Sequence, residues 1–141
     1  MVEFTIPGKP QGKARARTVY NPRINRSVSY TPDNTVLYEN LIKTLYLEKY
    51  PGECFSKGEA LHIRIQVYYE PPKSISKKKR EEMLAGNLLP CKKPDIDNIA
   101  KAVLDALNGV AYGDDNQVTA LEVSKYYAAQ AHVDVTIFEE K

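Results

Sequence analysis

Residues 61–69 impose the strongest constraint on how this chain folds, because apolar and polar side chains alternate along the whole segment. The apolar positions are Leu61, Ile63, Ile65, Val67 and Tyr69. Successive side chains of a strand point to opposite faces, so the pattern predicts a β-strand with one buried face. Such a strand needs partner strands and a covering layer, which the rest of the chain must supply.

Other segments predict these partners. Val2–Ile6 alternates in the same way and predicts a short strand. Helices are expected from the N-cap Thr31, with Pro32 in the first turn, to about Tyr50, from Ser76 to Leu84, and from Ile96 to Asn108. Residues 118–127 and 131–138 predict a closing β-hairpin.

The predicted order β–α–β–α–α–β–β indicates an α+β domain spanning residues 1–141. We expect a small mixed or antiparallel sheet with its helices packed on one face. Residues 7–32 hold several Gly, Pro and Asn residues and no sustained period, so they predict a long loop or arm. Loops of that length in compact domains are usually functional or disordered.

Several classes of protein are excluded by composition. A chain of 141 residues can bury one real core, and no stretch approaches the ~20 apolar residues of a membrane span. The first residues lack the basic and then apolar pattern of a signal peptide. Cys54 and Cys91 are far apart, which argues against a disulfide framework or a zinc site. We therefore expect a cytoplasmic protein with no membrane partner.

Charge falls into three blocks, although the net charge is only +2. Residues 9–26 hold six basic side chains and no acid, and residues 73–93 hold seven basic side chains against two acids. Residues 95–115 reverse the sign, with five aspartates against one lysine. Basic surroundings around an acidic centre are typical of a protein that binds a polyanion and a divalent cation. The alternative for either basic block alone is a solvated surface.

The acidic block begins at the predicted start of the last helix. Asp95 occupies the N-cap position and Asp97 the first turn, while Asp97, Lys101 and Asp105 share a stripe opposite the apolar face. That apolar face is expected to contain Ile96, Val103 and Leu107. A capped helix with an Asp–Lys pair is the simpler interpretation.

A second acidic pair, Asp114 and Asp115, follows the same helix. Adjacent like charges are unfavourable unless a cation neutralises them, and carboxylate oxygens suit Mg²⁺ or Mn²⁺. Lys101 could then stabilise charge on a scissile phosphate. The spacing does not fit an EF-hand or a Gly-rich phosphate loop, and neither His62 nor His132 has metal-ligand spacing.

Several motifs together resemble the RusA family of Holliday junction resolvases, in the branch found in phages and Gram-positive bacteria. The motif residues are Lys93-Pro94-Asp95-Ile96-Asp97-Asn98, Lys101, Asp105-Ala106-Leu107-Asn108-Gly109 and Tyr112-Gly113-Asp114-Asp115-Asn116-Gln117-Val118, with Gly8, Pro10, Lys13, Arg15 and Arg17 in the arm. The resemblance covers nearly the whole chain. The combination of the two acidic motifs is specific, whereas Asp-x-Asp alone is not.

The resemblance implies a Mg²⁺-dependent homodimeric endodeoxyribonuclease, with Mn²⁺ able to substitute and no small-molecule cofactor. It would nick symmetric strands of a four-way DNA junction in recombination and repair. The family's essential carboxylates fall on Asp95, Asp97 and Asp115, its catalytic lysine falls on Lys101, and Asp114 is a further candidate metal ligand.

DNA contacts are expected from the two basic blocks. The candidate residues are Lys13, Arg15, Arg17, Arg23, Lys77, Lys78, Lys79, Arg80 and Lys93. Tyr20 and Tyr30 are candidates for stacking on unpaired bases, although a core position is the favoured interpretation for Tyr30. Two other functions stay open: a non-catalytic DNA-binding module, and a nuclease acting mainly on forks or flaps.

Overall fold

The computed structural model describes residues 1–14, 16–30 and 32–140. The strands are β1 (Val2–Pro7), β2 (Arg17–Asn21), β3 (Arg26–Tyr30), β4 (Leu61–Tyr69), β5 (Val118–Tyr127) and β6 (His132–Glu139). The helices are α1 (Asp33–Lys49), α2 (Lys77–Leu84) and α3 (Ile96–Leu107), and a 3₁₀ turn, η1 (Asp115–Gln117), follows α3.

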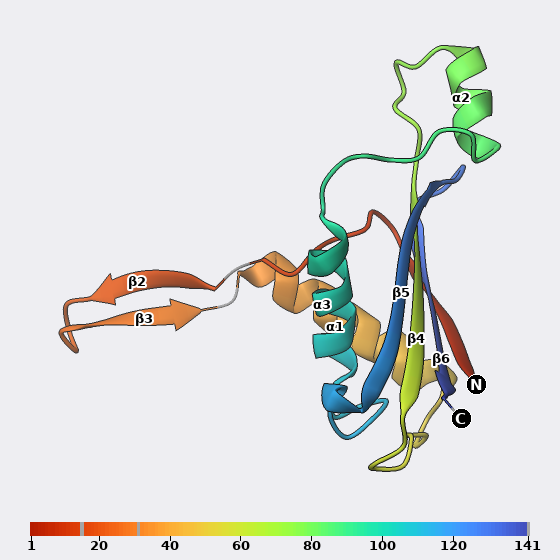
Figure 1. The fold of residues 1–141 in the computed structure, drawn as a ribbon. Helices are drawn as coiled ribbons and strands as arrows, with labels where there is room; N and C mark the ends of the chain where they lie inside the picture. The colour runs from red at the N-terminus through yellow and green to blue at the C-terminus, as the bar shows by residue number, and fades with distance from the viewer. Residues whose placement is uncertain (15, 31, 141) are drawn as a thin grey trace.

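The main sheet has the strand order β1-β6-β4-β5 and carries α1 and α3 on one face (Figure 1). β4 runs parallel to β5 and antiparallel to β6, and β6 runs antiparallel to β1. The expected α+β fold with a mixed sheet is therefore confirmed, as is the order of its main elements. The structure adds a separate two-stranded hairpin, β2–β3, before α1.

The core lies between the sheet and these two helices. The apolar positions of β4 are all buried, which confirms the alternation read from the sequence. The core-facing helical residues include Tyr38, Ile42, Tyr46, Ile99, Val103 and Leu107. Burial of these side chains is the main favourable term in folding. It also fixes the rotation of α3, so that Asp97 and Lys101 lie on its exposed face.

Three sequence-based expectations are wrong. β5 and β6 do not form a hairpin, because β4 lies between them and pairs with both. The sequence pattern identified β5 and β6 as strands, but it carries no information on which strands pair with each other. Ile96 was expected in the apolar face of α3, yet it is 45% exposed because it is the first helical residue and precedes the turn that packs on the core. The third wrong expectation concerns the conformation of residues 17–30 in the arm.

Residues 7–32 were expected to form a long loop or arm. Residues 17–30 do project from the sheet and helices as an arm, but they form the regular β2–β3 hairpin and not a loop (Figure 1). Its strands are exposed almost throughout, so they show no alternation of buried and solvated positions. Asn25, in the turn, adopts a positive φ of 50°, which asparagine tolerates better than most residues. The predicted N-cap Thr31 lies outside the described residues, and Pro32 occupies the N-cap position of α1.

Within the described ranges, no helix is long and apolar enough to cross a membrane.

Candidate functional site

Two aspartates lie exposed where α3 begins. Asp95 is the N-cap residue and Asp97 lies in the first turn, as the sequence predicted. Within the described part of the chain, however, the Asp95 side chain accepts no capping hydrogen bond from the helix. A capping hydrogen bond therefore does not explain why a carboxylate occurs at position 95. Both acids lie at the positive end of the helix dipole, which favours bound or ionised negative groups there.

A hollow of about 440 Å³ opens beside Asp95. Lys9, Lys13 and Lys93 line it together with Asp95, and Asn98 of α3 lies on the same wall. The hollow thus brings together three residues that sequence analysis proposed separately. Lys9 and Asn98 were not assigned a role, although both lie within the motifs that suggested the site. Basic side chains around a carboxylate can hold an anion next to a cation.

The base of the arm packs directly on the start of α3. A Cβ on Gly12 would lie 2.9 Å from the Cβ atoms of both Pro94 and Asn98, so only glycine allows this approach. The backbone N–H of Lys13 donates to the carbonyl of Asn98 at 2.8 Å. The backbone N–H of Ala14 donates to Oγ1 of Thr35 in α1 at 3.2 Å. Residues 12–14 therefore fix the arm between α1 and α3.

Lys13 occupies an internal position in this network. Its ammonium pairs with Glu39 of α1 and lies 3.3 Å from Oδ2 of Asp105. Burial alone would lower the pKa of Lys13, but hydrogen bonds to Glu39 and Asp105 outweigh burial and raise the pKa above its usual value. The side chain is 23% exposed. The structure thus places Lys13 in ion pairs within the fold, whereas the sequence suggested a phosphate contact.

Lys101 lies midway along the exposed face of α3. Its Nζ lies 3.3 Å from Oδ1 of Asp105, one turn further along the helix, and its side chain is 63% exposed. An exposed surface pair of this kind contributes only a few tenths of a kcal/mol, so the lysine can leave Asp105 at little cost. The ammonium is therefore free to reach a phosphate that lies over α3.

The second acidic pair follows the other end of α3. The side chain of Asp114 accepts a hydrogen bond from the N–H of Asn116 at 3.4 Å and caps η1. The pKa of Asp115 is raised, first by a hydrogen bond with Asp114, then by desolvation and by the charges of Asp114 and Asp105, while Lys101 opposes the shift. The negative charges of Asp114, Asp115 and Asp105 therefore repel one another, and a bound cation would relieve this repulsion.

The predicted metal ligands are not gathered at one point. α3 has 12 residues and is about 18 Å long, with Asp95 and Asp97 at its start and Asp114 and Asp115 beyond its end. Among the described residues, no three His, Cys, Asp or Glu side chains form a group that could hold a metal ion. The donors are nevertheless all carboxylates. Mg²⁺ typically takes one or two of these and completes its shell with water and substrate phosphates, so the residues present fit this ion.

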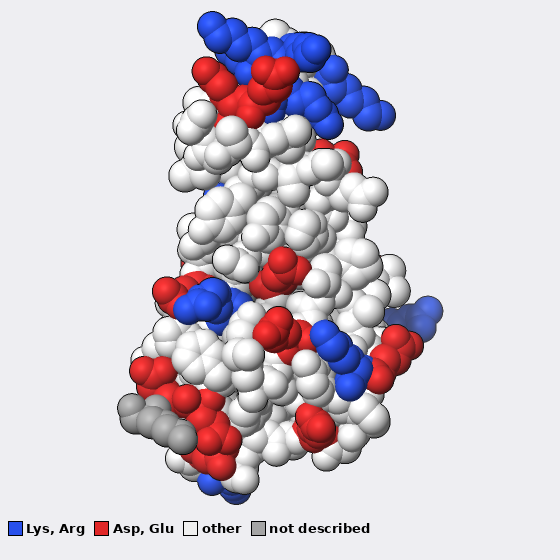
Figure 2. Space-filling model, turned by 90° about the vertical axis from the view of Figure 1, so that its right-hand side faces the viewer, with Lys and Arg blue, Asp and Glu red and all other residues white. Residues whose placement is uncertain are grey.

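The second basic block forms a distinct surface at the end of the molecule. Lys77, Lys78, Lys79 and Arg80 are exposed on α2, whose N-terminus is capped by Ser76 accepting a hydrogen bond from the N–H of Lys79 at 3.3 Å. Figure 2 shows their side chains clustered at the top of the molecule. α3 begins at its end nearer to α2, to which a long connection joins it (Figure 1). This surface can contact a long polyanion that also enters the hollow.

The other predicted DNA-binding residues lie in the arm and in the segment before α3. Arg17 is in β2 and Arg23 is in the hairpin turn, and both are exposed. Lys93 precedes Asp95 and lines the hollow. Arg15 lies outside the described residues. Tyr30 is 47% exposed, so the core position that the sequence favoured for this side chain is wrong.

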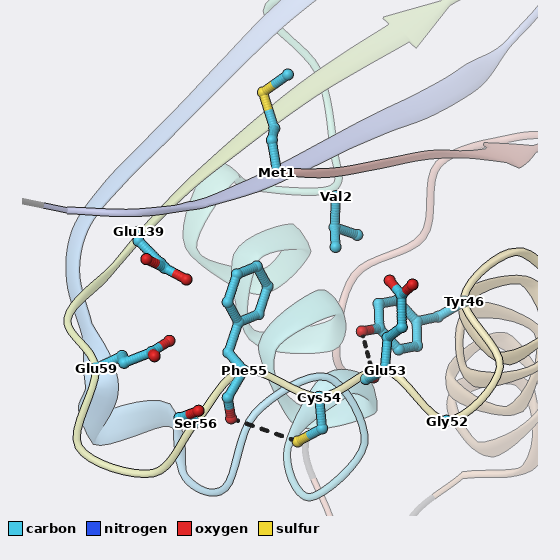
Figure 3. Close-up of a pocket in the computed structure, with 10 residues that line it drawn as sticks. All are labelled: Met1, Val2, Tyr46, Gly52, Glu53, Cys54, Phe55, Ser56, Glu59 and Glu139. Atoms are coloured by element: carbon cyan, nitrogen blue, oxygen red, sulfur yellow. Dashed lines mark hydrogen bonds between the residues drawn. The ribbon is translucent and has the colours of Figure 1, made fainter.

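A further cavity of about 360 Å³ lies away from all of these residues (Figure 3). Glu53, Glu59 and Glu139 line it, and within it the hydroxyl of Tyr46 donates to the carbonyl of Glu53 at 2.7 Å. Burial raises the pKa of Tyr46 to about 12. Carboxylates without accompanying lysine or arginine in its described lining would repel a polyanion, so this cavity does not fit a nucleic-acid site.

Comparison with known proteins identifies the class. Residues 7–138 match the family described as "Endodeoxyribonuclease RusA", so the protein is a nuclease that cleaves DNA. The chain belongs to the RusA endodeoxyribonuclease family, which confirms the resemblance read from its motifs. This membership also removes the alternative of a non-catalytic DNA-binding module.

Two relatives are informative. The chain is 33% identical over 141 residues to the uncharacterized protein YqaN of Bacillus subtilis (strain 168), across 98% of this chain and 96% of that protein. It is 27% identical over 99 residues to a protein of Lactococcus phage r1t named crossover junction endodeoxyribonuclease rusA. That alignment covers 70% of this chain and 69% of the phage protein.

Proposed function

We propose that this protein is a Mg²⁺-dependent endodeoxyribonuclease that resolves four-way DNA junctions by paired symmetric cuts in recombination and repair. The observation that carries the proposal is the hollow at the start of α3, where three lysines lie around Asp95. The side chain of Asp95 makes no capping hydrogen bond within the described part of the helix. The name of the phage relative supports a crossover junction as the substrate. We place this activity in the cytoplasm, where the DNA of a bacterial or phage-infected cell lies.

The exposed face of α3 supplies the proposed catalytic groups. Asp95 and Asp97 would hold Mg²⁺ at the start of α3, and Asp115, with Asp114, would supply carboxylate ligands beyond its other end. When bound, Mg²⁺ supplies a polarised phosphoryl oxygen and an activated water. Lys101 is exposed and only weakly held by Asp105, so its ammonium can stabilise the negative charge that develops on the scissile phosphate.

The basic surfaces on either side of α3 would orient the DNA. The α2 residues from Lys77 to Arg80 and the hairpin residues Arg17 and Arg23 would bind phosphates, and Lys93 would do so within the hollow. Such contacts give affinity and register without sequence specificity. Arg15 has the same role in this proposal on sequence grounds.

The proposed symmetric cleavage would require two active sites, and we propose that a homodimer supplies them. A four-way junction presents two equivalent strands, and a two-fold dimer presents one active site to each of them. Paired cuts by a protein that stays strictly monomeric on the junction in sedimentation experiments would contradict this arrangement.

The proposal is tested by cleavage of a four-way junction, a fork, a flap and a linear duplex that share one sequence, with Mg²⁺ present. We expect the junction to be cut fastest, with nicks at symmetric positions. Equal rates on all four substrates would overturn the selectivity for branched DNA. Faster cleavage of the fork or flap would replace the junction as the substrate.

A further inference from the structure

The β2–β3 hairpin exposes apolar side chains well away from the core. The exposed fractions of Val19, Val28 and Tyr30 are 53%, 40% and 47%. A two-stranded hairpin is only marginally stable in water by itself, and this one packs none of these side chains into the core cluster. A projecting hairpin with an apolar surface therefore points to a partner that covers it.

The register of the hairpin places these side chains on one face. Arg17 pairs with Tyr30, Val19 with Val28, and Asn21 with Arg26. Directly paired residues point to the same side, and so do alternate residues along a strand. We call this side the Arg–Tyr face, formed by Arg17, Val19, Asn21, Arg26, Val28 and Tyr30. It borders a hollow of about 390 Å³ lined in part by Val19, Val28 and Tyr30.

The opposite face differs in chemistry. Thr18 and Ser29 hydrogen-bond to each other at 3.0 Å, so their polar groups are satisfied within the hairpin. Ser27 is also small and polar, and Tyr20, which pairs with it, is 57% exposed and donates its hydroxyl to Oδ1 of Asn25. Only the Arg–Tyr face combines an apolar centre with cationic ends.

The positive charge of this face determines which kind of partner can bind it. Arg17 and Arg26 lie at its two ends, and the sequence holds no acid from residue 9 to residue 32. A second copy of the same face would bring the arginines of both copies together without a neutralising carboxylate. DNA would instead place phosphates against the arginines and a base against the aromatic ring and the valines.

We propose that the Arg–Tyr face binds bases exposed at the branch point of DNA, with Arg17 and Arg26 on the flanking phosphates. The proposal rests on the branched-DNA function above. Bases inside a duplex present only their edges, whereas opening of the coaxial stack at a branch makes base faces available. The face would therefore add preference for branched DNA, whereas the α2 surface would bind any duplex.

The position of the hairpin supports this role. Residues 12–14, at its base, are fixed to Asn98 of α3 and Thr35 of α1. The chain therefore leads toward the hairpin from the start of α3, where Asp95 and Asp97 lie.

The test uses full-length Tyr30→Ser and Tyr30→Phe, with Thr18→Ala on the opposite face as the control. Ca²⁺ replaces Mg²⁺ to limit cleavage. The substrates are a four-way junction with 2-aminopurine at the branch, the same junction with 2-aminopurine inside one arm, and a linear duplex. Affinity, 2-aminopurine fluorescence and sedimentation are measured.

We expect Tyr30→Ser to lose roughly tenfold in junction affinity while duplex affinity is unchanged, as removal of one base-stacking side chain predicts. Its fluorescence response at the branch should disappear, and Tyr30→Phe and Thr18→Ala should behave as wild type. Equal affinities of Tyr30→Ser and wild type for the junction would overturn the inference. A shift of Tyr30→Ser from dimer to monomer in sedimentation would overturn it in favour of a second copy as the occupant. If the wild-type protein shows no preference for the junction, the proposed function itself fails.

Discussion

Lys13 and Lys101 share the carboxylate of Asp105, with each ammonium 3.3 Å from a different oxygen. The first lysine belongs to the base of the arm and the second to the exposed face of α3. Lys13 also pairs with Glu39, so it joins the arm, α1 and α3 at one point. The carboxylate that pairs with the proposed catalytic lysine therefore also pairs with a residue far away in the sequence.

Replacing Lys13 should slow cleavage more than it weakens binding. In Lys13→Met, Asp105 loses one of its two cations and should hold Lys101 more strongly, away from the phosphate. We expect the single-turnover rate on saturating junction to fall about tenfold, equivalent to ~1.4 kcal/mol, which lies within the range for coupled ion pairs. Lys13→Arg keeps the charge and should recover part of the rate.

The contrasting outcome is equally specific. If Lys13 contacts a phosphate, as the sequence suggested, Lys13→Met should lower affinity and reduce the salt dependence of binding by about one unit of slope. An unchanged rate on saturated substrate together with that change in slope would contradict the positioning role.

Gly12→Ala tests whether the arm must pack closely on α3. The added Cβ would meet the Cβ atoms of Pro94 and Asn98 at 2.9 Å, and neither atom lies at the end of a flexible side chain. We expect a loss of ~1–3 kcal/mol in the free energy of unfolding, typical of overpacking, measured by thermal or denaturant unfolding. Gly12→Val should cost more. Unfolding transitions that match the wild-type protein would show that the arm does not need this contact.

The basic surface of α2 should contribute affinity and not chemistry. Lys78→Ala and Lys79→Ala should each weaken binding to every DNA substrate and reduce the salt dependence by about one unit of slope. Lys49→Ala, at the end of α1, is the control because it removes an exposed lysine from another surface. Loss of cleavage at saturating DNA by either α2 variant would place that lysine in the chemical step.

The parts of the fold that the sequence predicted correctly are those that depend on residues close together in the chain. The bounds of β4 and α3 and the Ser76 cap of α2 were predicted because each depends on neighbouring residues. The pairing of β5 with β4 was not, because it is fixed by contacts between distant segments. The hairpin was missed because strands exposed on both faces carry no periodic signal.

The candidate site shows the same division. Asp95 and Asp97 were placed correctly at the start of α3, since caps and first turns are local features. The ion pairs of Lys13 with Glu39 and Asp105 depend on tertiary packing, and the sequence showed only a lysine in a basic arm. Asp114 and Asp115 follow α3 as predicted, but only the fold shows that they do not gather with Asp95 and Asp97 at one point.

Metal dependence is expected to follow the carboxylate chemistry. EDTA should abolish cleavage, and Mg²⁺ or Mn²⁺ should restore it. Ca²⁺ should support DNA binding with little cleavage, because its looser coordination positions a reacting water poorly. Cleavage rates in each ion, with binding measured in parallel, check this. Full activity in EDTA would remove the metal from the account.

The most direct test is single-turnover cleavage of a four-way junction by Asp97→Asn, with binding measured on the same substrate. The change removes a metal-binding charge and a negative charge near the DNA. We expect cleavage to fall by orders of magnitude while junction affinity holds or rises. Asp33→Asn is the matched control, because Asp33 is an exposed aspartate in the first turn of α1, and it should cut at the wild-type rate. If Asp97 only stabilises the helix, Asp97→Asn should cost at most ~1 kcal/mol in thermal unfolding and leave cleavage intact. An Asp97→Asn protein that folds normally and cuts at the wild-type rate would contradict the assignment of this site.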